Sequence, residues 1–250
     1  MTEPLVGLFV VMKVPFVATV VVVCVLVGLG LLLVPQSDDL DLLIGLAEAG
    51  DAEAQFNLGT NYEIGNGVSI DVEKAASWLR RAADQGHSGA QFSLAQKYFE
   101  GAGVDQDTVE AVKWTLLAAK QEHMLAQLSL GQLYFFGQGV QQDDSQAAKW
   151  IRKAAEQGYA RAEDNLGWLY SNGRGVSQDD NAAIQWYRRA AEKGLATAQF
   201  SLGLMYATGR GVGRDMGEAE RWYRLAAEQG YAEAKGALLD IENRGDVSEF

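Results

Sequence analysis

The chain has 250 residues, a formal net charge of −12 and hydrophobic residues at 48% of its positions. This negative charge disfavours binding to nucleic acid and to anionic lipid, and it is compatible with a basic partner. The single cysteine, Cys24, excludes a disulfide within the chain and a cysteine metal site. We therefore expect no nucleic-acid partner and no cysteine chemistry.

An uncharged apolar segment covers residues 14–34, after a short N-terminal segment of residues 1–13. Its 21 residues would form a helix about 30 Å long, the thickness of the hydrocarbon layer of a membrane. Lys13 precedes the segment, and no Lys or Arg follows it before Lys74. The positive-inside rule then places the N-terminus in the cytoplasm. We expect a single-pass transmembrane helix, a signal anchor, with the rest of the chain periplasmic or lumenal.

A cleaved signal peptide is the alternative interpretation of this segment. Gly28 and Gly30 provide small residues at suitable offsets for cleavage, after an apolar region over 14–27. The apolar run continues to Val34, which favours the uncleaved anchor. A lipoprotein anchored at Cys24 fits less well, because no small residue directly precedes that cysteine.

From residue 51 the sequence repeats every 36 residues, and columns of leucine, tyrosine, glycine, valine and aspartate all keep this step. Tryptophan marks the period once in every copy, at Trp78, Trp114, Trp150, Trp186 and Trp222. Five full copies cover 51–86, 87–122, 123–158, 159–194 and 195–230. A Gly-x-Gly string that recurs five times in register is typical of a structural turn rather than of a nucleotide-binding loop.

Each copy is predicted to form two helices. In the first copy Ala54, Leu58 and Tyr62 lie on one face of a first helix, and Trp78 and Leu79 belong to the apolar stripe of a second. The Gly-x-Gly between them permits positive φ and ends the first helix, and the aspartate that follows suits the N-cap of the second. Another glycine ends the second helix in most copies.

The string AQFSLGLMYATGRGVGRDMGEAERWYRLAAEQG, from Ala198 to Gly230, resembles the Sel1-like repeat, a relative of the tetratricopeptide repeat. The resemblance covers about 180 of the 250 residues. It implies an all-α fold, a right-handed α/α superhelix (solenoid) of five helix-turn-helix repeats. Stacked copies would bury the apolar faces that a single copy leaves exposed. The resemblance also implies an adaptor that holds protein partners on a curved surface.

Half-repeats are expected to cap both ends of the solenoid. Residues 38–50 align with the second helix of a missing copy, with Leu42 in the tryptophan column and Gly50 in the closing glycine column. Residues 231–243 align with the first helix of a sixth copy, and residues 244–250 form a polar tail.

The second copy departs most from the pattern. Ala95 replaces a glycine, Thr115 follows the tryptophan, and Glu122 stands where a closing glycine is expected. These changes predict a looser or kinked junction near 95–122.

No catalytic string of a known type occurs in the sequence. His87 and His123 stand 36 residues apart in one column, so stacked repeats would hold them too far apart to share a metal ion. We interpret them as surface residues before a helix. Neighbouring carboxylates such as Asp143 and Asp144 lie where helix capping is expected. The chain is therefore predicted to be no enzyme and to need no cofactor or metal.

Partner specificity is expected on the first helices, on the face away from their predicted core. In related solenoids the first helix lines the concave side. Apolar residues on a face where solvent favours polar ones indicate an interface, with small polar residues beside them as hydrogen-bonding groups. The candidate partner-binding residues are Leu125, Ser129, Gln132, Phe136, Arg161, Asn165, Trp168 and Leu204. Two alternatives stay open: the small polar residues fit a crowded inner curve, or the apolar residues contact a neighbouring helix.

These observations predict a membrane-anchored, non-catalytic scaffold that binds a protein or peptide on its concave face, in an envelope or membrane-associated complex. One alternative is a soluble secreted or periplasmic binding protein, produced by cleavage near Gly30. A hydrolase that acts on envelope polymers and a structural subunit of a membrane complex are further alternatives.

Overall fold

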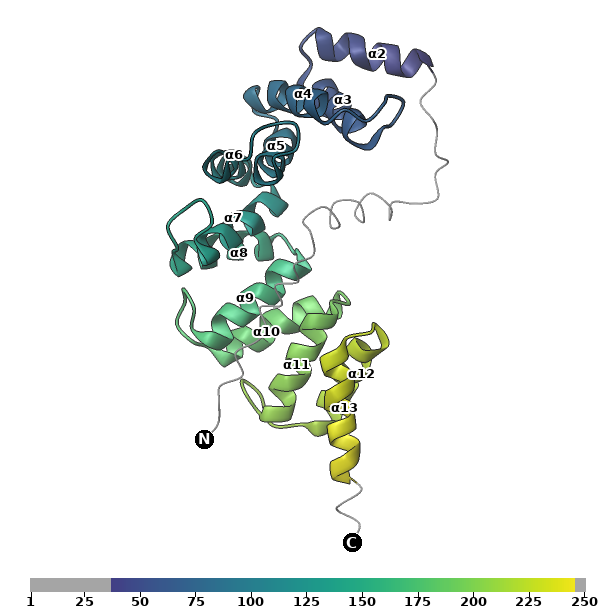
Figure 1. Cartoon of the computed structure of the whole chain (residues 1–250). Helices are drawn as coiled ribbons and strands as arrows, with labels where there is room; N and C mark the ends of the chain where they lie inside the picture. The colour runs from purple at the N-terminus through teal and green to yellow at the C-terminus, as the bar shows by residue number, and fades with distance from the viewer. Residues whose placement is uncertain (1–36, 246–250) are drawn as a thin grey trace.

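The computed structural model describes residues 37–245, which form 12 α-helices and no strand (Figure 1). The prediction of an all-α solenoid is confirmed. The predicted transmembrane helix, residues 14–34, lies outside the described residues. Within residues 37–245, no helix combines the length and the hydropathy that a membrane span requires.

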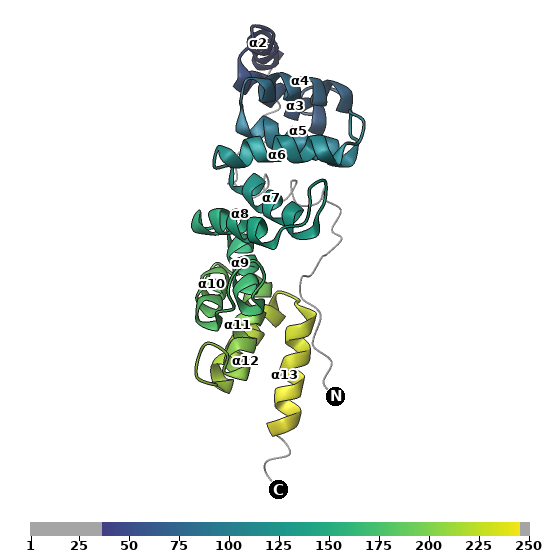
Figure 2. The same ribbon diagram turned by 90° about the vertical axis from the view of Figure 1, so that its left-hand side faces the viewer.

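Ten of the helices, α3 to α12, form five consecutive pairs, and each pair packs against the next along the chain. Figure 2 shows the pairs as layers stacked one below another. We call α3, α5, α7, α9 and α11 the first helices and α4, α6, α8, α10 and α12 the second helices. The bounds are α2 Ser37–Glu48, α3 Ala52–Ile64, α4 Val72–Asp84, α5 Ser88–Glu100, α6 Thr108–Lys120, α7 Met124–Phe136, α8 Asp144–Glu156, α9 Ala160–Asn172, α10 Asp180–Glu192, α11 Ala196–Thr208, α12 Met216–Glu228 and α13 Ala232–Gly245.

The turn between the two helices of a pair is built by glycine and aspartate, as the sequence predicts. Gly173 ends α9 in the left-handed conformation, and its N–H donates to the carbonyl of Leu169. Asp179 then caps α10 by accepting a hydrogen bond from the N–H of Ala182. The other four pairs end the first helix at a left-handed glycine and begin the second at an aspartate cap.

The two histidines are N-caps of first helices. Nδ1 of His87 accepts a hydrogen bond from the N–H of Ala90 at 3.0 Å, and Nδ1 of His123 accepts from Ala126 at 3.2 Å. Both side chains are half-buried rather than simple surface residues. Burial lowers the pKa of His123, which keeps its ring neutral and Nδ1 available as an acceptor.

The core is a row of apolar clusters, one at each junction of the stack. The predicted leucine column lies at its centre, since Leu94, Leu130, Leu166 and Leu202 are 0% exposed. A second buried column was not predicted and holds Lys97, Leu133, Leu169 and Met205. First helices bury this additional face because each packs both against its own second helix and against neighbouring repeats.

The second repeat is packed as tightly as the others, so the prediction of a looser junction is wrong at the α5–α6 pair. A Cβ on Gly59 would crowd Leu79, and one on Gly131 would crowd Ile151. In the second repeat the smaller Thr115 takes the place of that leucine or isoleucine and leaves room for the methyl group of Ala95. The two departures from the repeat pattern therefore compensate each other.

The turn at Glu122 also keeps its shape. Glu122 has φ +63°, and it is the one non-glycine residue in residues 37–245 with a positive φ. Its N–H donates to the carbonyl of Ala119, as the N–H of Gly158 does to Ala155 one repeat later. The chain thus adopts the turn without glycine, at a conformational cost of about 1 kcal/mol.

Candidate partner-binding surface

The eight predicted residues all lie on three consecutive first helices, α7, α9 and α11. We call the surface that they form the first-helix face. Phe136 and Leu204 are each 42% exposed, and Arg161 is exposed. The remaining five are half-buried: Leu125, Ser129, Gln132, Asn165 and Trp168.

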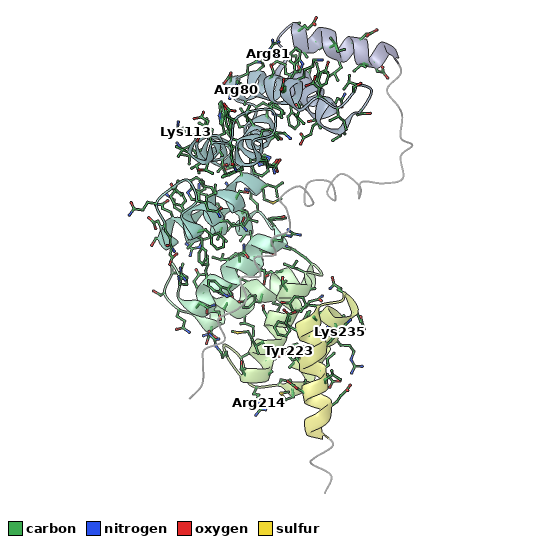
Figure 3. All side chains as sticks on the ribbon, viewed as in Figure 1. Arg80, Arg81, Lys113, Arg214, Tyr223 and Lys235 are labelled. Carbon is green, nitrogen blue, oxygen red and sulfur yellow. The ribbon has the colours of Figure 1, made fainter. Side chains whose placement is uncertain are left out.

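The opposite side of the array is formed by the second helices and carries many charged side chains. Figure 3 shows Lys113 on the left, on the side of α6 that faces away from α5. The ends of the array, α2 and α13, lie on the other side of the stack in the same view (Figure 1). The first helices α3 and α5 therefore lie on the side toward which the array bends.

Trp168 belongs to the first-helix face, and its ring also packs against side chains of the two neighbouring repeats. Its ring meets the edge of Phe135 at a centroid distance of 5.8 Å, and it packs against the core clusters on both sides of α9. Leu125 similarly packs against the cluster between the second and third repeats. These contacts support the alternative that part of the apolar pattern serves helix packing. Leu204 occupies the position of Trp168 in the next repeat, and its side chain is more exposed than that of Trp168.

A buried glutamine pair recurs in four of the repeats, and one bond from each pair reaches a backbone carbonyl of the preceding helix. In the third repeat the side-chain amide of Gln127 donates to the carbonyl of Ala119 at 3.2 Å, and its oxygen accepts from Gln157 at 2.8 Å. The same two bonds are made by Gln55, Gln91 and Gln199 with their partners. All four glutamines are at most 5% exposed, so these bonds satisfy buried amide groups.

The fourth repeat replaces the glutamine pair with a buried ion cluster. Glu163 is 0% exposed, and its two oxygens lie 2.7 Å from Nζ of Lys193 and 3.0 Å from Nε of Arg189. Lys193 also donates to the carbonyl of Gly158 at 2.6 Å. Glu163 was not predicted as a functional residue, although a carboxylate in a column of glutamines is a signal in the sequence.

Asp164 is a second carboxylate of α9 that was not predicted from the sequence. Its Oδ2 accepts a hydrogen bond from the Thr197 hydroxyl of α11 at 2.7 Å. Burial raises the pKa of Asp164 to about 6, and the bond from Thr197 opposes this rise. The nearby Tyr187 has its pKa raised above the usual range, first by burial and then by the charge of Asp164.

Arginine clamps hold the loops of the last repeats to the preceding repeat. Arg174 forms a two-pronged ion pair with Asp144, with nitrogen–oxygen distances of 2.6 and 3.0 Å, and its guanidinium lies over the ring of Phe135. Arg210 binds Asp180 in the same way and also donates to the carbonyl of Ser171. Each loop is thus fixed to the start of the second helix of the repeat before it.

No metal centre is formed by the part of the chain that the structure describes, since no three His, Cys, Asp or Glu residues converge there. A shallow open pocket lies beside the loop of the fourth repeat, between Arg152, Tyr170 and residues 176–181.

The repeat pattern matches a known family along most of the chain. The profile described as Sel1 repeat matches residues 52–87, 88–123, 125–159, 160–195 and 196–231. The chain belongs to the Sel1-repeat family. Sel1-repeat proteins generally mediate protein–protein interactions and are typically non-catalytic scaffolds.

Solved structures of Sel1-repeat proteins share this fold. A Sel1 repeat protein from Oxalobacter formigenes is 37% identical, with a TM-score of 0.75 over 78% of this chain and 80% of that one. The protein c5321, a protective antigen present in uropathogenic Escherichia coli strains, is 36% identical, with a TM-score of 0.61. That match covers 82% of this chain and 52% of c5321, so the chain corresponds to about half of that protein. A search of curated proteins found no match.

Proposed function

We propose that this Sel1-repeat protein is a non-catalytic scaffold that binds a protein or peptide partner on its first-helix face. The observation that carries the proposal is the exposure of Leu204, 42%, on a face that also holds half-buried polar residues such as Asn165. An exposed apolar residue with hydrogen-bonding groups around it is typical of a binding hot spot. The general role of Sel1-repeat proteins in protein–protein interaction supports the same function.

We further propose that residues 14–34 anchor the scaffold in a membrane, with the repeats on the periplasmic or lumenal side. The length and apolar character of the segment support this placement, as does the single lysine before it. The scaffold would then hold its partner in an envelope or membrane-associated complex. N-terminal sequencing of the mature protein tests the anchor, and a mature chain that begins at Leu31 would contradict it.

Site-specific photocrosslinking in intact cells tests the binding face. A photoreactive amino acid is placed at Arg161, which is exposed on α9, or at Gln185, which is exposed on the second helix α10. We expect a discrete crosslinked partner from position 161 and none from position 185. Equal crosslinking from both positions, or crosslinking from position 185 alone, would contradict the proposed face.

A further inference from the structure

Asp164 stands where the other four repeats have an apolar residue. The equivalent positions are Phe56, Phe92, Leu128 and Phe200. A carboxylate in such surroundings destabilises the fold unless a cation or several hydrogen bonds compensate for its lost hydration. Its presence therefore calls for a partner group.

The structure supplies only part of that compensation. Thr197 donates to Oδ2, and within residues 37–245 no Lys, Arg or His forms an ion pair with Asp164. The adjacent Glu163 differs, because two cations neutralise it. Asp164 also retains partial exposure to solvent, so a ligand can reach it from the surface.

The surroundings of Asp164 are hydroxyl groups and aromatic rings. Tyr187, whose hydroxyl lies close to that of Ser201, is near enough for the carboxylate to perturb it. Tyr231 also lies within the electrostatic reach of Asp164, and its buried hydroxyl has no hydrogen-bond partner among the described residues. The ring of Phe200 packs against Tyr231 at a centroid distance of 5.3 Å. These groups offer additional acceptors and an apolar wall to a bound side chain.

The position of Asp164 connects it to the first-helix face. It lies one helical turn from Arg161 and from Trp168, and Thr197 belongs to the next first helix. Asp164 therefore lies between α9 and α11, next to residues that we propose bind the partner.

We propose that Asp164 and Thr197 form a pocket between α9 and α11 that binds the ammonium group of a lysine side chain of the partner. This inference rests on the proposed function and adds the chemistry of the partner. A lysine ammonium can be bound by Oδ1 while Oδ2 keeps its hydrogen bond from Thr197. The net charge of −12 favours a basic partner as well.

The ionisation of Asp164 makes the binding dependent on pH. A bound ammonium favours the ionised carboxylate, so affinity is expected to rise as the pH passes through about 6. Among the ionisable groups in its environment, the hydroxyls of Tyr187 and Tyr231 are kept neutral in this range by burial. Arg210 lies within electrostatic reach of Tyr187, and Glu233 lies within reach of Tyr231. Arg161 and the ion-paired Glu163 are the charged side chains nearest to it in the sequence of the same helix.

The test uses the full chain in detergent micelles and a fluorescein-labelled peptide, (Gly-Lys-Gly) repeated four times, with its Nε-acetyllysine form as the second probe. Fluorescence anisotropy should show binding of the lysine peptide alone. Asp164→Asn should weaken it at least about tenfold and abolish its rise with pH, because a hydrogen bond between charged groups is lost. The matched control Glu192→Gln removes an exposed carboxylate on α10 and should leave the affinity unchanged.

Stability separates a binding role from a structural one. Asp164→Leu, which installs the residue of the third repeat, should raise Tm by about 2–8 °C because it removes a buried charge, while it eliminates peptide binding. Equal weakening by Asp164→Asn and Glu192→Gln would overturn the pocket, as would equal binding of the acetylated peptide or a lower Tm for Asp164→Leu. Crosslinking at position 161 without binding of the lysine peptide would overturn the pocket and leave the proposed function standing.

Discussion

Gly175→Ala is expected to lower the free energy of unfolding by about 3 kcal/mol or more. Gly175 has φ +68°, and a Cβ at this position would collide with the backbone carbonyl of Asp144 in the preceding repeat. The loop cannot move away easily, because the bonds from Arg174 hold it to the same aspartate. Urea unfolding of the full chain, followed by circular dichroism, measures the effect.

Gly213→Ala is the matched control for this prediction. Gly213 belongs to the corresponding loop of the next repeat, its φ is not positive, and a Cβ there would meet no atom within 4 Å. We expect a change within about 0.5 kcal/mol. An equal loss of stability from both substitutions would show that the close approach of Gly175 to Asp144 does not hold the repeats together.

Glu163→Ala is expected to lower the free energy of unfolding by about 2–4 kcal/mol. The substitution removes a fully buried carboxylate and leaves Lys193 and Arg189 without their anionic partner. This loss of stability is smaller than the loss from breaking a fully buried ion pair, because both cations are partly exposed and can regain water. The same urea titration measures it.

The double variant Glu163→Gln with Lys193→Gln provides the control for the ion cluster. It installs the glutamine pair that Gln127 and Gln157 form in the third repeat. Because four of the five repeats use this pair, we expect the double variant to recover most of the stability that Glu163→Ala loses. If the double variant were as unstable as Glu163→Ala, the two kinds of connection would not be equivalent.

The positions of the helices could be predicted from the sequence because their signals are local. An aspartate cap such as Asp179 acts on the N–H three residues later, and a glycine such as Gly173 can adopt positive φ without steric cost. The period of 36 residues then extends these local signals to all five copies. The buried leucine column could be predicted for the same reason, because its residues occupy the same position on every first helix.

The side-chain chemistry of the fourth repeat depends on contacts between residues that are far apart along the chain, and it was therefore missed. A helical wheel places Trp168 on a free face, but only the packing of α7 against α9 brings it to Phe135. Asp164 and Glu163 acquire their roles from Thr197 and Lys193, which lie 33 and 30 residues further along the chain. A comparison of columns for charged residues among apolar ones would have identified Asp164.

The central claim, that the first-helix face binds the partner, is tested most directly by two leucines of equal exposure. Leu204 on α11 is 42% exposed and Leu117 on the second helix α6 is 43% exposed. Each is replaced by aspartate, and the yield of the partner crosslinked from position 161 is measured in intact cells. We predict that Leu204→Asp lowers the yield about fivefold to tenfold and that Leu117→Asp leaves it unchanged. Equal yields from the two variants would contradict the claim.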